Sequence, residues 1–238
     1  MGSQERRARE RNATRERILA AARDLFVREG FEKVTLRRIA EAIEYTPAAL
    51  YVHFEDKHAL MSALCDQDFG LLREAMRTAD AIEDPVERVR AIGGAYVDFA
   101  LAHPHHYRFM FMTPWPSTVE AEMIIAGEKK AIKHGNPDED AYAFLRHGVA
   151  ACIEQGRFKE PYTDVGVVTQ MCWASAHGIV SLFITHGHDP WVDFRSPQRS
   201  AHLLLDAVLD GMVATPRVAT AVTGAASGAA TATPEARS

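Results

Sequence analysis

Hydrogen-bond donors of several kinds gather between positions 35 and 57, in the stretch TLRRIAEAIEYTPAALYVHFEDK. Hydroxyl, guanidinium, imidazole and ammonium groups bind phosphate oxygens, and such contacts set the register of a protein on duplex DNA without reading its sequence. The phosphate-binding candidates are Thr35, Arg37, Arg38, Tyr51, His53 and Lys57. For Tyr51 and His53 the competing interpretation is that both only pack the interior of this region.

Residues that could read base edges lie at one predicted helix start within this stretch. Thr46-Pro47 is a strong start, because a threonine hydroxyl can cap a backbone N–H and proline is tolerated at the first helical position. The base-reading candidates are Tyr45, Thr46, Pro47 and Ala48. These side chains offer few donors and acceptors, so reading would depend on apolar contact with thymine methyl groups. A guanine contact from Arg37 or Arg38 could add to it.

Helical periodicity predicts the scaffold that must position these residues. Ile39 and Ile43 fall at helical spacing in a first short helix, and Leu50 and Phe54 lie four residues apart in a second. Two helices this short cannot bury a core alone. Residues 12–30 supply a longer helix with an apolar stripe, formed by Ile18, Leu19, Ala22, Leu25 and Phe26. The prediction is a three-helix helix-turn-helix head over residues 12–55.

At these residues the chain resembles the tetracycline-repressor (TetR) family of bacterial transcription regulators. The matching text is TRERILAAARDLFVREGFEKVTLRRIAEAI followed by TPAALYVHFEDKHAL, which together cover about the first sixty residues. The resemblance implies phosphate contacts from Thr35, Tyr51, His53 and Lys57. It also implies an operator-binding regulator for which repression is the usual outcome.

The turn between the two short helices departs from the family pattern. The family usually places a glycine and a small hydrophobic residue where this chain has Glu44 and Tyr45. Glutamate pays a steric penalty in a left-handed backbone conformation that glycine adopts freely. The turn therefore either has a different shape or holds Glu44 under mild strain.

The composition is that of an ordinary globular protein, with 238 residues, 47% hydrophobic and 25% charged. We find neither an apolar run of about 18 residues nor a signal peptide, so we expect a cytoplasmic protein with no membrane partner. Cys65, Cys152 and Cys172 show no C-x-x-C spacing and read as reduced thiols. No phosphate loop, dinucleotide fingerprint or nucleophile elbow occurs, so we predict no enzyme, no cofactor and no catalytic residue.

Charge is distributed unevenly along the chain. Residues 1–60 carry 12 Lys and Arg against 10 Asp and Glu, so they have a net charge of +2 within a chain of −5. Residues 1–11 are polar and arginine-rich, and we predict a disordered basic arm there. This arm would either follow the DNA backbone or enter the minor groove, or it would be a solvated tail.

The remaining chain predicts a larger helical body over residues 56–213 and a disordered tail over residues 214–238, where large apolar side chains are scarce. No segment alternates at a period of two residues, so the fold class is all-α, without a sheet. The body helices are expected at residues 56–79, 84–103, 117–133, 138–155, 163–187 and 196–212.

Large aromatic and methionine side chains in the body suit a deformable apolar pocket. Trp173, His177 and Gly178 also resemble the C-terminal domain of a TetR subgroup named for these three residue types. The ligand-binding candidates are Phe109, Met112, Trp115, Phe144, Gln170, Met171, Trp173 and His177. For each residue alone, core packing is the competing interpretation.

A head this small reads only a few base pairs, so we expect a homodimer on a palindromic operator with half-sites about 34–36 Å apart. The last two helices would pack against their mates as a four-helix bundle. The dimer-interface candidates are Ala174, Gly178, Ser181, Leu182, Leu204, Leu205, Val208 and Met212.

The function predicted is a ligand-responsive DNA-binding regulator, a repressor released when a small apolar effector moves the helix at residues 56–79. A rival function is a helical small-molecule, haem or metal carrier with a vestigial head. The histidine-rich segments 103–106 and 186–189 would supply a metal site, although their spacing matches no known motif. Two further rivals are a small hydrolase using His177 and a DNA binder with no effector.

Overall fold

A computed structural model describes residues 2–114, 136–138 and 140–214. Across these residues the regular secondary structure is helical, apart from one isolated bridge between Phe158 and Val213. The predicted all-α class is therefore confirmed. The helix predicted at 117–133 and the tail beyond residue 214 lie outside the described residues.

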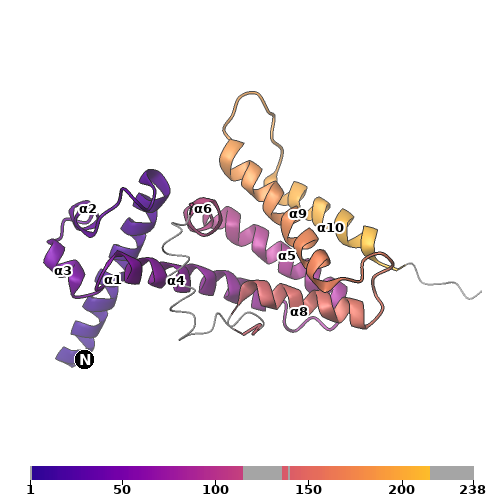
Figure 1. The fold of residues 1–238 in the computed structure, drawn as a ribbon, viewed down its shortest axis with the longest axis horizontal. Helices are drawn as coiled ribbons and strands as arrows, with labels where there is room; N and C mark the ends of the chain where they lie inside the picture. The colour runs from indigo at the N-terminus through magenta and orange to yellow at the C-terminus, as the bar shows by residue number, and fades with distance from the viewer. Residues whose placement is uncertain (1, 115–135, 139, 215–238) are drawn as a thin grey trace, which may run out of the picture.

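The N-terminal head contains three helices, α1 (Ser3–Glu29), α2 (Leu36–Ala42) and α3 (Pro47–Tyr51) (Figure 1). Their contact is apolar, with Ile18 and Phe26 of α1 buried against Ile39 and Leu50. The helix-turn-helix head thus forms around the apolar stripe that periodicity predicted.

Helix α1 starts nine residues earlier than the sequence predicted, so residues 3–11 are helical where a disordered arm was expected. No glycine or proline interrupts this segment, and helix formers such as arginine, glutamate and alanine fill it. Glu5 accepts a hydrogen bond from the Gly2 N–H, and Arg6 pairs with Glu10 one turn later. The segment therefore has no large apolar side chains with which to contact the core, but its residues still have high helical propensity.

The turn between α2 and α3 places Glu44 in a strained backbone conformation. The φ angle of Glu44 is +61°, in the left-handed region, while the Tyr45 N–H donates to the Ala40 carbonyl at 2.9 Å. Of the two turn shapes that the sequence left open, the structure has the one with the strained glutamate.

Replacing Glu44 with glycine should raise the free energy of unfolding by about 0.5–1 kcal/mol, because glycine adopts a positive φ without a Cβ clash. Urea denaturation of both proteins measures the difference. Glu44→Ala is the matched control, since alanine removes the carboxylate but keeps the clash. An equal gain in the alanine variant would assign the effect to charge and contradict the strain.

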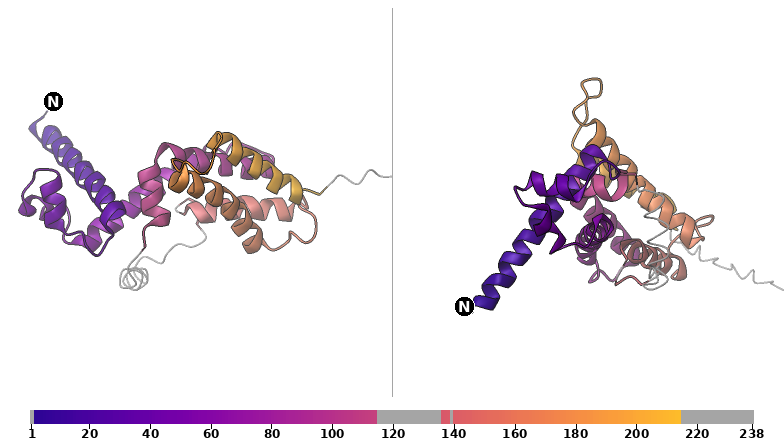
Figure 2. Two further views of the ribbon diagram at one scale, coloured as in Figure 1. Left: turned by 90° about the horizontal axis from the view of Figure 1, so that it is seen from above. Right: turned by 60° about the vertical axis from the view of Figure 1, so that its left-hand side comes forward.

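One long helix, α4 (Lys57–Arg77), runs from the head into the body (Figure 1). The body packs α4 with α5 (Pro85–Ala102), α6 (Pro104–Met112), α8 (Ala141–Glu154), α9 (Val165–His186) and α10 (Pro197–Met212). The last two helices lie side by side along the body, on the side away from α4 (Figure 2).

The short helix α6 lies between head and body, in contact with α1, α4 and α5. Phe109 is fully buried and stacks on Phe26 of α1, with ring centroids 6.2 Å apart. From the same helix, His105 bonds Asp24 of α1 at 2.9 Å, and His106 bonds Asp68 of α4 at 3.0 Å. Helix α6 therefore holds the head against the body.

Candidate nucleic-acid interface and effector pocket

Helix α3 presents its first turn to the outside. The Thr46 hydroxyl accepts a hydrogen bond from the Ala49 N–H at 3.3 Å, as its predicted capping role requires, and Pro47 occupies the first helical position. Leu50 is fully buried and anchors the helix on the head. Thr46, Pro47 and Ala48 are not buried in the head, so this turn is free to approach a DNA groove.

Lys57 and Tyr51, two of the phosphate-binding candidates, differ in exposure and in their contacts with the rest of the head. Lys57 donates to the Phe31 carbonyl at 2.9 Å, and its ammonium lies 4.1 Å from the centroid of the Phe31 ring. Burial lowers the pKa of Lys57 and outweighs the opposing effect of Glu32. An ammonium group has three donors, so two remain for a phosphate. Tyr51 is 58% exposed and available.

The two arginines of α2 are held by ion pairs with acidic neighbours. Arg37 pairs with Glu41 at 3.0 Å, and Arg38 pairs with Glu29 at 3.2 Å. A guanine contact from either arginine would require its ion pair to break. Thr35 caps α2 by accepting from the Arg38 N–H at 3.1 Å.

Tyr45, one of the base-reading candidates, is half-exposed beside α1. The Arg17 guanidinium lies 5.2 Å from the centroid of the Tyr45 ring, and it also donates to the Ile43 carbonyl at 3.3 Å. Sequence reasoning missed this contact, because Arg17 belongs to a different helix and lies 28 residues away. Arg17 therefore stabilises the turn.

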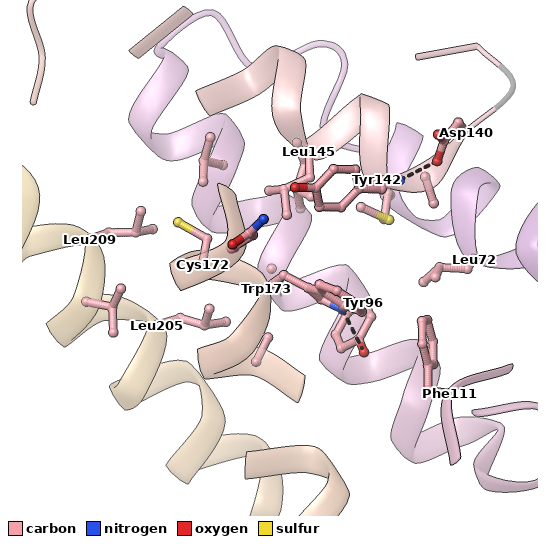
Figure 3. Close-up of a pocket in the computed structure, with 18 of the residues that line it drawn as sticks. Leu72, Tyr96, Phe111, Asp140, Tyr142, Leu145, Cys172, Trp173, Leu205 and Leu209 are labelled. Atoms are coloured by element: carbon pink, nitrogen blue, oxygen red, sulfur yellow. Dashed lines mark hydrogen bonds between the residues drawn. The ribbon is translucent and has the colours of Figure 1, made fainter. Parts of the chain in front are cut away.

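A cavity of about 530 Å³ lies in the body between α4, α5, α8, α9 and α10, with Phe111 of α6 at its edge (Figure 3). It is large enough for a drug-sized molecule. The lining residues from the first half of the chain are Phe69, Leu72, Met76, Val89, Ile92, Gly93, Tyr96 and Phe111. Those from the second half are Asp140, Ala141, Tyr142, Leu145, Gln170, Cys172, Trp173, Ala176, Leu205, Val208 and Leu209.

Of the predicted ligand-binding residues, Gln170 and Trp173 line this cavity. Phe109 and Phe144 are buried outside its lining, whereas Met112 and Met171 are exposed at the surface. Trp115 lies outside the described residues. The lining residues of α4 and α5 were missed, since their apolar stripes do not distinguish a cavity wall from a solid core.

His177 lies beside the cavity lining and anchors a polar cluster with three aromatic side chains. Its Nδ1 is 2.6 Å from the Tyr107 hydroxyl and 3.1 Å from the Tyr96 hydroxyl. The Trp173 indole N–H donates to the Tyr96 hydroxyl at 3.3 Å, a bond visible in Figure 3. The cluster therefore places a hydroxyl and an indole on one side of a cavity that is largely apolar.

This cluster is uncharged at neutral pH. Burial raises the pKa of Tyr96 to about 12, despite hydrogen bonds with Tyr107 and Trp173 that lower it. Burial also raises the pKa of Tyr107 and lowers that of His177. The tyrosines keep their protons and the imidazole stays neutral, so the cluster offers hydrogen bonds without a net charge.

The outer faces of α9 and α10 carry exposed apolar side chains. Leu182, Ala174 and Leu204 are exposed, and a Cβ added at Gly178 would meet open space. Leu205 and Met212 are instead buried in the protomer, contrary to their predicted place on the dimer surface. Val208 is half-buried and lines the cavity, and Ser181 is half-buried, its hydroxyl donating to the Gly178 carbonyl. The α10 stripe at 201, 205, 209 and 212 faces inward, because these positions share one helical face.

Helix α9 is long and apolar enough to cross a membrane by length and composition, although the sequence was expected to contain no such run. Only 33% of its most apolar window is buried within the protomer. Core helices of globular proteins also have this length and composition. Because most of the α9 window is not buried within the protomer, α9 has an apolar surface that a neighbouring element could cover.

Three histidines of the histidine-rich segments form hydrogen bonds with acidic side chains. His186 bonds Asp189 at 2.8 Å, and His105 and His106 bond the carboxylates of two other helices. Across the part of the chain that the structure describes, no group of three His, Cys, Asp or Glu side chains could hold a metal ion. Cys65, Cys152 and Cys172 are buried free thiols.

Two family models match the chain. One, described as "Tetracyclin repressor-like, C-terminal domain", matches residues 89–208, and the other, "Bacterial regulatory proteins, tetR family", matches residues 18–64. The transcriptional regulator UidR of Escherichia coli (strain K12) is 31% identical over 83 residues, 35% of this chain and 39% of UidR. The repressor Rv1474c of Mycobacterium tuberculosis is 43% identical over 56 residues, 24% of this chain and 30% of that repressor. The chain therefore spans 39% or less of the length of these two curated relatives.

Solved structures match over more of the chain at lower identity. The TetR family regulator PfmR of Thermus thermophilus has a TM-score of 0.59 at 21% identity, covering 81% of this chain and 97% of PfmR. The ketosteroid regulator KstR2 of Mycobacterium tuberculosis has a TM-score of 0.62 at 20% identity, covering 85% and 96%. SmeT in complex with triclosan has a TM-score of 0.62 at 20% identity, covering 86% and 93%. At these identities the likeness establishes the fold.

The structure thus combines a helix-turn-helix head, whose α3 begins with an exposed turn, with a helical body that contains a largely apolar cavity. The matched models together cover both the head and the body. The chain belongs to the TetR family of bacterial transcriptional regulators, which confirms the resemblance carried by the head residues.

Proposed function

We propose that the protein is a repressor that binds a palindromic operator as a homodimer and is released by a small, largely apolar effector. The observation that carries this proposal is the path of α4. Its first residue, Lys57, lies in the head, whereas Phe69, Leu72 and Met76 of the same helix line the cavity. An effector that contacts these three side chains acts directly on the helix that supports the DNA-binding head.

The effector can shift operator binding only if it binds the dimer more tightly at one separation of the two heads than at the other. A ligand seated against Leu72 and Met76 would favour the position of α4 that leaves it room. The paired heads would then no longer match half-sites about 34–36 Å apart.

The lining of the cavity supports a neutral effector. Asp140 is the one charged residue among its described lining residues, and that carboxylate caps α8 by accepting from the Tyr142 N–H at 2.8 Å. No described lining residue is a cation that would offset the cost of burying a carboxylate or phosphate. The Gln170 side-chain amide and the Tyr96 hydroxyl, which both line the cavity, would bind one polar group of an otherwise apolar molecule. Triclosan, the ligand of SmeT, and the ketosteroids after which KstR2 is named are molecules of this general kind.

Membership of the Trp-His-Gly subgroup is part of this proposal. Trp173 and His177 are joined through the Tyr96 hydroxyl at 3.3 and 3.1 Å, and Gly178 follows on the outer face of α9. The three residues would therefore have separate roles, with two at the pocket and the glycine where a second helix approaches.

The dimer would form through α9 and α10, as an arrangement of four helices. The exposed apolar positions of these helices support it, namely Val167, Met171, Ala174, Leu182, Leu203 and Leu204. Burial of these side chains against a second copy of the chain would also account for the apolar character of α9. The assembly would act in the cytoplasm, without a membrane partner or a cofactor.

A selection for duplex fragments bound by the purified full chain tests the proposal. We expect an inverted repeat bound by two copies of the chain, and release by neutral apolar ligands but not by carboxylates of similar size. Ala176→Leu, which fills part of the cavity wall, should weaken the ligand response at least about tenfold and leave operator affinity unchanged.

Two results would contradict parts of this proposal. Recovery of fragments without a repeat, bound by one copy, would exclude the dimeric operator complex. A response to ligand that survives Ala176→Leu unchanged would place the effector somewhere other than the cavity.

A further inference from the structure

The first turns of α1 extend beyond the rest of the head, past the end where α3 lies (Figures 1 and 2). Arg7, Arg11 and Arg15 follow one another at intervals of four residues on this extension, so they share one face of the helix. We call these three residues the arginine row. They border one shallow surface hollow together with Ala8 and Asn12.

The arginine row continues from the DNA-binding face of the head. The Arg15 guanidinium lies 5.3 Å from the centroid of the Phe54 ring, shortly after α3. Burial lowers the pKa of His53, and the charges of Arg11 and Arg15 lower it further, so both guanidiniums lie near this phosphate-binding candidate. The positive charge of the row therefore lies beside the surface that carries His53 and α3.

The charges of the row are available for a partner. Arg6 pairs with Glu10, and Glu5 accepts from the Gly2 N–H. Among the residues that the structure describes, neither Arg7 nor Arg11 makes an ion pair. Within the same described residues, Arg15 makes one ion pair, a contact of 3.8 Å with Glu16, which lies next to it in the chain.

We propose that the arginine row binds the phosphate backbone of duplex DNA beside the groove that α3 enters, so that the operator contact extends past the helix-turn-helix footprint. This inference rests on the proposed function. From Arg7 to Arg15 the helix rises through eight residue steps, or about 12 Å along its axis at 1.5 Å per step. That length corresponds to roughly three to four base pairs at 3.4 Å each. Helical geometry places the arginines side by side along the backbone, whereas a flexible arm would insert them singly into the minor groove.

The test compares two triple variants that change the net charge equally. In the row variant Arg7, Arg11 and Arg15 become glutamine. In the control variant three exposed cations of the body become glutamine, Arg146, Lys159 and Arg195. Dissociation constants are measured between about 50 and 200 mM salt, on the selected duplex with and without about ten flanking base pairs.

We expect the row variant to lose at least about tenfold in affinity for the long duplex, with the preference among sequences unchanged. The slope of log affinity against log salt concentration should fall by about 2–3, since each phosphate contact contributes about 0.9. On the short duplex the row variant should bind as the unmodified chain does. The control variant should keep the original slope on both duplexes, and circular dichroism should show folded helices in all three proteins.

Equal slopes for the row variant and the control variant on the long duplex would overturn the inference while leaving the proposed function intact. The same holds if the row variant loses binding only to single-stranded RNA or to vesicles of phosphatidylglycerol, since the partner would then be another polyanion. If the unmodified chain selects no duplex at all, the proposed function itself fails.

Discussion

Replacing Ala48 with glutamate should lower operator affinity at least about 100-fold, which corresponds to roughly 2.7 kcal/mol. Ala48 lies exposed in the first turn of α3, the part of the head that we expect to enter the major groove. A carboxylate there faces the phosphates of the groove walls at close range, and like charges brought together in an interface cost several kcal/mol. Electrophoretic mobility shift or fluorescence anisotropy on the selected operator measures the loss.

The loss cannot come from unfolding, because an acidic residue in the first turn of a helix is favourable to the helix dipole. Ala48→Gln is the matched control, with the same shape and no charge, and it should change sequence preference more than affinity. Ala81→Glu adds the same charge at an exposed turn of the body and should leave operator binding unchanged. Full operator affinity in Ala48→Glu would show that α3 does not enter the groove.

The head could be predicted from sequence because its determinants are local. Thr46 caps α3 and Thr35 caps α2, each within three residues of the N–H from which it accepts. The apolar stripe of α1 also lies within one helix. The extent of α1 could not be predicted in the same way, since a solvent-exposed helix of charged residues has no apolar periodicity to mark its start.

The cavity could be predicted only as a property of the body. An apolar stripe indicates which face of a helix is buried, but the tertiary packing of several helices decides whether that face meets a neighbour or a void. Phe109 therefore packs at the head–body junction, where it stacks on Phe26, and not in the cavity. Trp173, one of the predicted ligand-binding residues, lines the cavity, whereas its partner Tyr96 lies 77 residues away and was not predicted.

A buried ion pair between head and body was also invisible in the sequence. Arg23 follows the apolar Ala22 in α1, and Asp68 precedes Phe69 in α4. The Arg23 side chain donates to both carboxylate oxygens of Asp68, at 2.8 and 2.6 Å, although 45 residues separate them. His106 of α6 adds a third contact at 3.0 Å. Pairings of this kind depend on the long-range arrangement of three helices.

Removing the Asp68 carboxylate should destabilise the protein by about 3–5 kcal/mol, because Asp68→Ala leaves the buried Arg23 guanidinium without its counter-charge. The Asp68 side chain is fully buried and that of Arg23 is 7% exposed, so water cannot replace the lost contacts. For a chain of this size the thermal midpoint should fall by roughly 10 °C. Differential scanning calorimetry of the full chain measures the change.

The effect of Asp68 should also depend on pH. Burial alone would raise the pKa of Asp68, but hydrogen bonds from His106 and Arg23 outweigh it, so the pKa lies below its usual value. The folded state then binds fewer protons than the unfolded chain near pH 4, and the stability from Asp68 is complete above the unfolded pKa of about 3.9. It is lost as the pH falls through the lowered pKa of the folded state. The difference between the unmodified chain and Asp68→Ala should therefore shrink below about pH 4, and an unchanged difference at about pH 3 would contradict the ionised pair.

A double variant distinguishes the effect of the two charges from the effect of the volume that the two side chains fill. Arg23→Met with Asp68→Leu replaces two buried charges by apolar groups of similar volume, and such replacements are often neutral or stabilising. We expect the double variant to recover most of the stability that Asp68→Ala loses, while His106, whose side chain is 22% exposed, remains within reach of water. If stability returns but the effector no longer releases the operator, the charges serve coupling between body and head. If the double variant is as unstable as Asp68→Ala, the cost reflects packing and not an unpaired charge.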